Sequence, residues 1–235
     1  MTRSSDGRQP RRPGLQSKWK GVVDSLEAII PIYEKGSSRI SFFADRGMRD
    51  DVASFAVGGE KGALVLDLGS GPGTLSRVVA HAGGVPVLAD ASRKMLARSP
   101  EFERVHCVFE HLPFRQGSFG AAVAGFSLRD SQDLELALTE IRQTIRRGGR
   151  FAFCDLGKPE SRLKATLVGA YILVAPPLIG LLTGGRSGLR FGSLFGTYKL
   201  VLDNPSLKRL LLTRFSQVEI EARQMGGSIV ARCGA

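Results

Sequence analysis

A glycine-rich stretch between two acids is the part of the chain best suited to bind a small molecule. It reads VLDLGSGPG and places Asp67 before Gly69, Gly71 and Gly73 in the pattern D-x-G-x-G-x-G. Glycines lack Cβ atoms, so a ligand can approach the backbone closely. Asp90 ends the next apolar run, at a position where a carboxylate can bind the hydroxyls of a ribose. The stretch therefore indicates a site for a nucleoside-bearing ligand.

The spacing of the glycines favours a ligand without a pyrophosphate. The dinucleotide fingerprint G-x-G-x-x-G has its third glycine one place after Gly73, where this chain has Thr74. Pro72 also removes a backbone N–H that would bind phosphate, and the carboxylate of Asp67 suits a cation. A cationic nucleoside without a pyrophosphate describes S-adenosylmethionine. The competing interpretation is a turn made for packing, with Asp67 and Asp90 as turn or cap residues.

The charge of the chain favours acidic partners. Its 235 residues carry a formal net charge of +11, which suits nucleic acid or an anionic membrane surface. Much of the excess lies in residues 1–20, which we expect to form a disordered basic tail without a secretory signal. The basic residues are not interleaved with aromatic ones and no RNA-binding module is recognisable, so we expect no nucleic-acid partner.

Cysteine and histidine are sparse. Cys107, Cys154 and Cys233 are far apart and match no metal-ligand spacing, so we expect reduced thiols and a cytoplasmic protein without a metal. Only three histidines are present, which leaves a metal-centred or Ser-His-Asp mechanism few starting points. His111 follows a predicted strand near the expected ligand site, but we do not assign it a catalytic role.

Strand-like and helix-like segments alternate along most of the chain. This order predicts an α/β fold with an open parallel sheet covered by helices. We expect one domain over 21–235, with helices before residue 60 and a helical lid or insertion over 159–213. The predicted strands are 63–68, 85–90, 104–109, 121–126 and 149–156, followed by a closing pair at 215–223 and 227–233; the helices between them are 74–82, 92–99 and 133–147.

From Tyr33 onward the chain resembles the ubiquinone/menaquinone biosynthesis C-methyltransferase (UbiE) family, a branch of the class I S-adenosylmethionine-dependent methyltransferases. The glycine stretch is similar to the first motif of the whole class, whereas FSLRD and the Tyr33 region are similar to this family in particular. The resemblance rests on YEKGSSRIS (33–41), VLDLGSGPG (65–73), LADASRKML (88–96), EHLPF (110–114), FSLRD (126–130), RRGGRFAFCDLGKP (146–159) and GGSIVA (226–231).

The resemblance implies a Rossmann-like, mostly parallel seven-stranded sheet and methylation of a ring carbon of a prenylated quinol. Such a carbon attacks the methyl group only once the neighbouring phenol has lost its proton. We expect Arg129, just beyond the fourth predicted strand at the carboxyl edge of the sheet, to lie beside that phenolate and to lower the pKa of the phenol or orient a water, unless it only pairs with Asp130 or another acid. Tyr33 either covers the active site or packs, and Asp155 either lines the substrate pocket or caps a helix.

The resemblance also implies which residues bind the cofactor. Val108 and Phe109 stand where related enzymes carry an acid or amide that reads the adenine, so Glu110 or backbone groups would take that role. Other departures from the family's motifs are Glu34, Ser37, Pro72, Asp130 and Arg147. The expected cofactor-binding residues are Asp67, Gly69, Ser70, Gly71, Gly73, Asp90, Ala91, Met95, Phe109, Glu110, Gly125 and Phe126.

An uncharged run between Lys164 and Arg186 is long enough to cross a membrane. We reject a span, because it would separate strands of one sheet, and Pro176 and Pro177 would break the helix. Two expectations remain: a broken helix packed over the sheet, or a lid that accepts a polyprenyl tail and dips into an anionic membrane surface. The second would make the protein peripheral at the inner face of the membrane.

Other functions remain open beside a quinol C-methyltransferase. The enzyme would then act on another apolar small molecule or lipid, or on RNA, or the chain would be a cofactor-binding relative with lost or changed activity. A homodimer is also left open.

Overall fold

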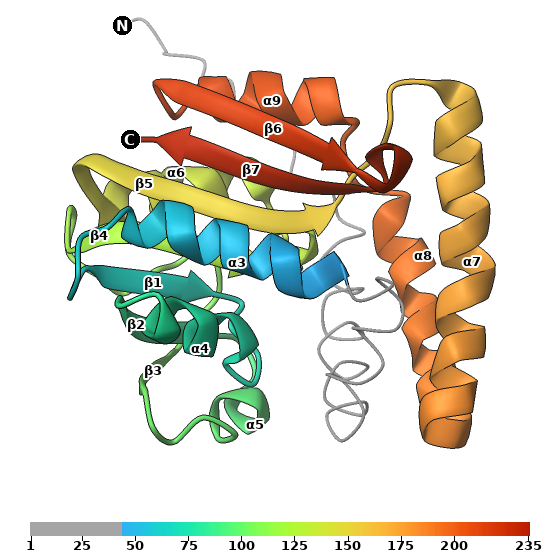
Figure 1. Ribbon diagram of the computed structural model, residues 1–235, viewed down its shortest axis with the longest axis horizontal. Coiled ribbons are helices and arrows are strands. Elements are labelled where there is room, and N and C mark those ends of the chain that lie inside the picture. The colour runs from blue at the N-terminus through green and yellow to red at the C-terminus, as the bar shows by residue number, and fades with distance from the viewer. Residues whose placement is uncertain (1–43) are drawn as a thin grey trace, which may run out of the picture.

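The computed structural model describes residues 44–235, which form a sheet of seven strands with helices on both faces (Figure 1). The strand order is β3-β2-β1-β4-β5-β7-β6. All neighbouring strands are parallel except at β7, which runs antiparallel to both β5 and β6. This arrangement confirms the predicted Rossmann-like α/β fold.

The strands fall close to the predicted runs. They are β1 (Leu64–Leu68), β2 (Val85–Asp90), β3 (Glu103–His106), β4 (Phe119–Gly125), β5 (Ile145–Leu156), β6 (Gln217–Arg223) and β7 (Ser228–Gly234). The helix predicted over 133–147 ends earlier than expected, at Thr144. Ile145 instead pairs with Phe119 of β4 and extends β5 toward its N-terminus.

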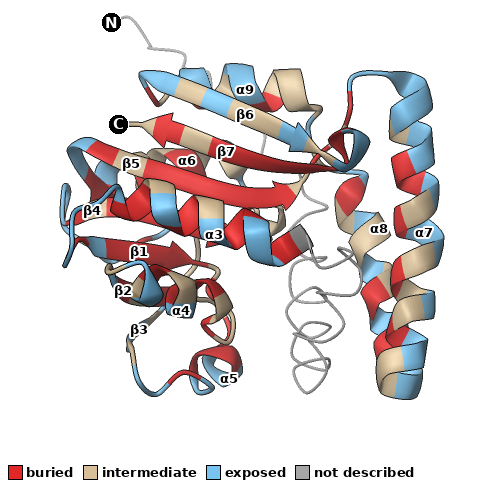
Figure 2. Cartoon of the chain, viewed as in Figure 1, coloured by how far each residue is buried: buried red, intermediate tan, exposed pale blue. Residues whose placement is uncertain are grey.

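Alternate side chains of the strands fill two cores. Leu66 and Phe151 belong to the core under α6 (Leu134–Thr144) and α9 (Asn204–Leu212). Val65 and Ala152 point the other way, toward α3 (Ala44–Val57) and α4 (Thr74–His81). This period of two is the pattern of strands buried on both faces, and Figure 2 shows β4 and β7 buried along most of their length. The helix predicted over 92–99 is a single turn, α5 (Arg93–Leu96).

The insertion between β5 and β6 corrects one expectation. Helix α7 (Arg162–Gly184) contains both Pro176 and Pro177 and is continuous, and it stands beyond the end of the sheet rather than over it (Figure 1). It packs on η3 (Gly185–Gly192) and α8 (Ser193–Tyr198). Each proline removes one intrahelical N–H donor, but the fixed φ of proline is compatible with a helix. The prediction of a broken helix packed over the sheet was therefore wrong.

Several expectations lie outside the described residues. They concern the basic tail over 1–20, the helices before residue 44 and the position of Tyr33.

Candidate cofactor and active site

The glycine loop joins β1 to α4, and its three glycines meet different surroundings. All three have positive φ, which favours glycine: +60° at Gly69, +56° at Gly71 and +75° at Gly73. A Cβ on Gly69 would lie 2.5 Å from the Cβ of Ser127, and one on Gly73 would lie 2.5 Å from Ser99 Oγ. A Cβ on Gly71 would meet no described atom within 4 Å. Gly69 and Gly73 therefore permit close packing, whereas Gly71 borders open space.

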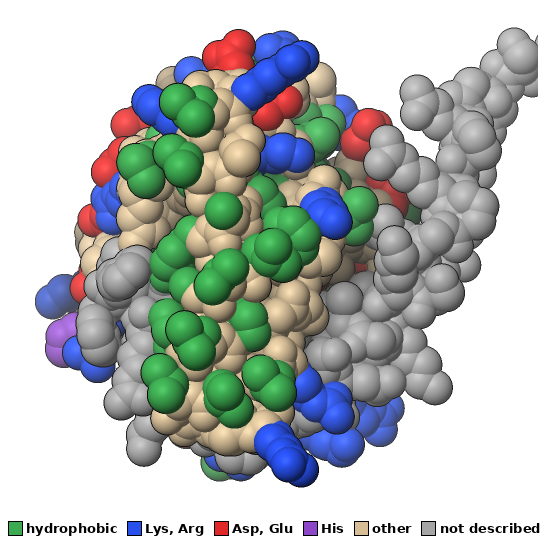
Figure 3. Space-filling view, turned by 90° about the vertical axis from the view of Figure 1, so that its right-hand side faces the viewer, with side chains coloured by type: hydrophobic (Ala, Val, Ile, Leu, Met, Phe, Trp, Pro, Cys, Tyr) green, Lys and Arg blue, Asp and Glu red, His purple; other side chains and the backbone are tan. Residues whose placement is uncertain are grey.

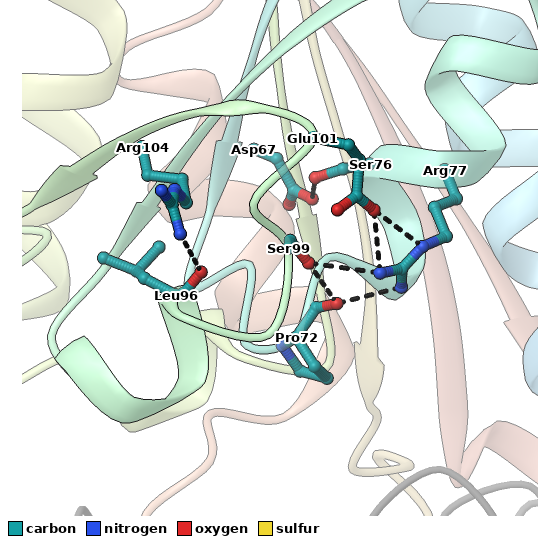
Figure 4. Close-up of polar contacts among 8 residues, drawn as sticks. All are labelled: Asp67, Pro72, Ser76, Arg77, Leu96, Ser99, Glu101 and Arg104. Atoms are coloured by element: carbon teal, nitrogen blue, oxygen red, sulfur yellow. Dashed lines mark hydrogen bonds and ion pairs between the residues drawn. The ribbon is translucent and has the colours of Figure 1, made fainter.

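Pro72 connects the loop by a hydrogen bond to the segment that follows α5. Its carbonyl oxygen accepts hydrogen bonds from Ser99 Oγ at 2.6 Å and from Arg77 Nη1 at 2.9 Å (Figure 4). Arg77 is held in turn by Glu101, with 2.9 Å between Nη2 and Oε1. The proline that departs from the resembled motif thus keeps a structural role through its carbonyl group.

Asp90, at the carboxyl end of β2, fixes the other side of the loop. Its Oδ2 accepts a hydrogen bond from the N–H of Gly71 at 2.8 Å, and its Oδ1 accepts one from the N–H of Ser92 at 2.7 Å. Each carboxylate oxygen has two lone pairs. Asp90 is therefore suited to hold the loop and also to accept hydrogen bonds from ribose hydroxyls.

The larger cavity lies at the carboxyl ends of β1, β2 and β4 and encloses about 800 Å³, including space open to solvent. This edge is where open α/β sheets bind ligands. Among the predicted cofactor-binding residues, the cavity brings together Gly69, Gly71, Asp90, Ala91, Met95, Phe109, Glu110 and Phe126. Sequence reasoning did not assign Ser92, Cys107, Leu112, Ser127 and Asp130 to this site, although they also line it.

Glu110 lines the cavity but is engaged elsewhere. Its Oε1 accepts hydrogen bonds from the N–H groups of Gln132 at 2.6 Å and Asp133 at 3.0 Å, where α6 begins. Val108 adds an apolar wall. The expected role of Glu110 toward an adenine would fall to its other oxygen, and backbone groups along 107–110 are the alternative donors and acceptors.

A smaller cavity of about 290 Å³ adjoins the same loop and contains a buried acid and a buried base. Asp67 is fully buried; its Oδ2 accepts a hydrogen bond from Ser76 Oγ at 2.5 Å (Figure 4), while its Oδ1 has no hydrogen-bond partner among residues 44–235. Burial raises the pKa of Asp67 to about 7, and the charge of Asp90 adds to this rise against the hydrogen bond from Ser76. Ser70, Gly125 and Arg49 also line this cavity.

Sequence reasoning missed Arg49. Arg49 lies on α3 and is 5% exposed, with its Nη1 2.5 Å from Asp45 Oδ2 one helical turn away. The Asp-x-x-x-Arg spacing was the available signal, but helical periodicity alone does not show that this face of α3 covers the glycine loop.

The two cavities together suit S-adenosylmethionine. They share Gly69 and Gly71. The unpartnered oxygen of buried Asp67 suits the ammonium group of the methionine part, and the guanidinium of Arg49 suits its carboxylate. Asp90 suits the ribose, and the apolar walls of the larger cavity suit the adenine. When bound, the cofactor supplies an activated methyl group on a sulfonium.

A buried ion pair lies beside the larger cavity. Arg129 Nη1 is 2.6 Å from Asp155 Oδ1, and the N–H of Arg129 donates to Asp155 Oδ2 at 3.0 Å. Arg129 also donates to the carbonyl oxygen of Phe126. Asp155 lies at the carboxyl end of β5 and Arg129 in the turn η2 (Leu128–Asp130) after β4. The FSLRD motif and the end of β5 are thus joined directly.

Asp130 connects this pair to the cavity. Its Oδ2 lies 3.7 Å from Arg129 Nη2, and the residue is among those that line the larger cavity. Its Oδ1 is buried and has no hydrogen-bond partner within the described part of the chain. Burial raises the pKa of Asp130 to about 6; Arg129 opposes this rise and Asp155 adds to it. Neither Arg129 nor Asp155 is itself among the residues that line the two cavities.

The described residues offer little for other chemistries. In residues 44–235 no three His, Cys, Asp or Glu side chains gather as metal ligands. Cys107 lines the larger cavity, but burial and the charge of Asp90 raise the pKa of its thiol to about 11, so the thiol is protonated at neutral pH.

The fold and the site define a class I S-adenosylmethionine-dependent methyltransferase. Residues 66–153 match the family described as a methyltransferase domain. The chain is 32% identical over 158 residues to a demethylmenaquinone methyltransferase of Mycobacterium sp. (strain KMS), covering 66% of this chain and 68% of the relative. It is 29% identical over 184 residues to a protein of the same name from Clavibacter sepedonicus, covering 74% and 75%. The chain belongs to the methyltransferase family that contains these relatives.

Solved structures agree with the fold. An S-adenosylmethionine-dependent methyltransferase of Thermotoga maritima superposes with a TM-score of 0.64 at 15% sequence identity, covering 90% of this chain and 98% of that one. At this identity the likeness concerns the fold alone.

Proposed function

We propose that the protein methylates a ring carbon of a prenylated quinol of the demethylmenaquinone type. The names of its relatives and the FSLRD motif support this substrate class. The observation that carries the proposal is the carboxylate of Asp130, a residue that lines the cofactor cavity and has Arg129 beside it. The ring carbon of a quinol becomes nucleophilic only after the phenol is deprotonated, and an ionised carboxylate at the cavity can accept that proton.

Asp130 has the properties of the base in this step. A carboxylate with a pKa of about 6 is mostly ionised at neutral pH but still takes up a proton. The phenolic O–H breaks, its proton passes to the carboxylate of Asp130, and the remaining electron pair is shared between the phenolate oxygen and the ring carbon. That carbon then forms a bond to the methyl group as the bond from methyl to sulfur breaks. Loss of the hydrogen on the same carbon as a proton to water restores the aromatic ring as a phenolate, which takes back a proton from Asp130. An asparagine, as in the resembled motif, cannot accept this proton.

The charges of Arg129 and Asp155 assist the same deprotonation of the phenol. The guanidinium of Arg129 favours the ionised forms of Asp130 and of a phenol bound next to it. Asp155 holds Arg129 in place through both its side chain and its N–H. In this proposal Arg129 keeps the role expected from the sequence, and Asp155 is a positioning residue rather than a wall of the pocket.

The test is methyl transfer by the purified protein. Demethylmenaquinol with a short prenyl tail and S-adenosylmethionine labelled in the methyl group should give a product with the label on a ring carbon, identified by mass spectrometry and NMR. A strain that lacks the gene should accumulate a quinone lighter by one methyl group. Calorimetric binding of S-adenosylmethionine without any labelled quinol would point to another apolar substrate. Absence of cofactor binding would point to a relative with lost activity.

A further inference from the structure

Helix α7 presents a continuous apolar surface to its outside. Figure 3 shows this face, with a column of hydrophobic side chains along it and basic side chains gathered at its lower end. The leucines and the valine of the column are 41% to 71% exposed. Their spacing of three and four residues places them on one side of the helix. We call this set the outer stripe: Leu163, Leu167, Ala170, Val174, Leu178 and Leu181.

The opposite side of α7 already has its partners. Val168 and Ile172 are buried in a small cluster with Tyr198 of α8. A Cβ on Gly180 would lie 2.1 Å from the carbonyl oxygen of Gly188, so η3 runs directly against the helix. The described part of the fold is therefore packed on the inner side of α7 and leaves the outer stripe exposed. Large contiguous apolar patches on protein surfaces mark interaction sites.

Most charges around the outer stripe are positive, and the one acid next to the start of α7 is the exposed Glu160. Residues 161–202 contain five basic side chains and no acid. Arg162 and Lys164 lie at the start of α7, Arg186 and Arg190 follow its end, and all four are exposed. A second copy of the chain laid on this face would bring like charges together, and residues 1–20 are themselves basic. Lipid phosphates, in contrast, complement these charges at both ends.

The connections of α7 favour a helix that lies on a bilayer. Over residues 44–235, α7 is the one helix long and apolar enough to cross a membrane, with a mean hydropathy of 2.0. However, β5 before it and β6 and β7 after it belong to one sheet, and its inner side is packed on η3 and α8. At 1.5 Å per residue its 23 residues extend about 34 Å. In a flat orientation the basic side chains at both ends reach the phosphates while the leucines enter the acyl region.

We infer that the outer stripe of α7 docks the protein on an anionic lipid bilayer. The inner side of the helix stays packed on its own domain, and the outer stripe and the four flanking basic residues contact lipid. This surface goes beyond the proposed function and does not depend on which substrate is methylated.

The test uses the full-length protein and vesicles made of phosphatidylcholine alone or of equal parts of phosphatidylcholine and phosphatidylglycerol. The protein should sediment with the anionic vesicles at low salt and less at high salt. The double variant Leu167→Gln/Leu178→Gln should lower the partition coefficient at least about tenfold. The matched control, Leu212→Gln/Met225→Gln, changes two exposed apolar residues on other surfaces and should change it less than about twofold.

A second readout locates the helix in the bilayer. Fluorescence from Leu178→Trp should be quenched by brominated lipids beyond the background of Trp19, whereas fluorescence from Leu212→Trp should not. Calorimetric binding of S-adenosylmethionine should be unchanged in all variants, which shows that they are folded. Equal loss of vesicle binding in both double variants, or equal binding to both kinds of vesicle, would overturn the inference. So would a dimer in solution that dissociates only when the outer stripe is changed, since that result assigns the surface to a second copy.

Discussion

Arg129 and Asp155 form a paired contact in which one carboxylate accepts hydrogen bonds from both the side chain and the backbone of the same residue, at 2.6 Å and 3.0 Å. The contact joins the turn after β4 to the end of β5 at the edge of the cofactor cavity. Because both side chains are less than 10% exposed, the loss of either partner leaves a buried charge uncompensated. Variants at this pair must therefore be tested for folding as well as for activity.

Replacement of Arg129 should separate catalysis from cofactor binding. We expect Arg129→Ala to lower kcat/KM by about a hundredfold or more, because a charge that stabilises the phenolate is lost. The dissociation constant of S-adenosylmethionine, measured by calorimetry, should change less than about twofold, since Arg129 does not line either cavity. Asp155→Asn, which keeps an acceptor for the N–H of Arg129, should have a smaller effect on kcat/KM. Equal losses of turnover and of cofactor affinity in Arg129→Ala would contradict the assigned role.

The base role of Asp130 predicts a pH profile. Since the ionised carboxylate is the active form and its pKa is raised to about 6, kcat/KM should fall as the pH drops through about 6. Asp130→Asn should lower activity and remove this acidic limb. A variant that is slow but retains the limb would show that another group takes the proton.

Asp67 should make cofactor affinity depend on pH. An ammonium group favours the ionised form of Asp67, so binding must release a proton wherever the free protein holds one. With a pKa of about 7, affinity for S-adenosylmethionine should be about tenfold weaker at about pH 6 than on the plateau above neutrality. Calorimetry in buffers of different ionisation enthalpy would detect the released proton.

The matched control is Asp67→Asn, in which the pH dependence of the affinity for S-adenosylmethionine should disappear. The same group affects stability with a defined sign. The folded pKa lies above the ordinary value of 3.8, so the folded state binds the extra proton between about pH 4 and pH 7. The contribution of Asp67 to the free energy of unfolding therefore falls as pH rises through this window. A rise instead would contradict the burial argument.

The glycine loop offers a comparison within one motif. Gly71→Ala should weaken cofactor binding, because its Cβ would point into the open space beside the site. It should lower the melting temperature only through the positive φ, which costs about 1–2 kcal/mol. Gly69→Ala should lower the melting temperature more, since its Cβ would also lie 2.5 Å from that of Ser127. Thermal unfolding and calorimetry on both variants check the difference. Equal effects on stability would refute it.

The strands could be predicted because each is an apolar run of the right length. For β2 the predicted bounds 85–90 agree at both ends with the structure. The common place of the glycine loop and Asp90 at the ligand site could also be predicted, since their order along the chain puts them at one edge of a parallel sheet.

The contacts between segments far apart in the chain could not be predicted from the sequence. Arg49 approaches the loop only because α3 packs across β4 and β5, and no local pattern gives that position. The break predicted at Pro176 and Pro177 failed because loss of two N–H donors does not end a helix whose remaining bonds and inner packing persist. Asp130 was expected as a departure from a motif and as a possible partner of Arg129, which the structure shows at 3.7 Å. Its place at the cavity could not be predicted, because it depends on the turn η2.

The order of the last three strands also constrains how the chain folds. β7 lies between β5 and β6, yet it follows β6 in the sequence. During synthesis β6 therefore has no edge to join until β7 has been made and inserted. Until then the growing chain carries α7, already apolar on both sides, on an incomplete sheet. We expect nascent chains that stop before residue 228 to be the ones that need a chaperone, since they would leave both β5 and β6 with open edges.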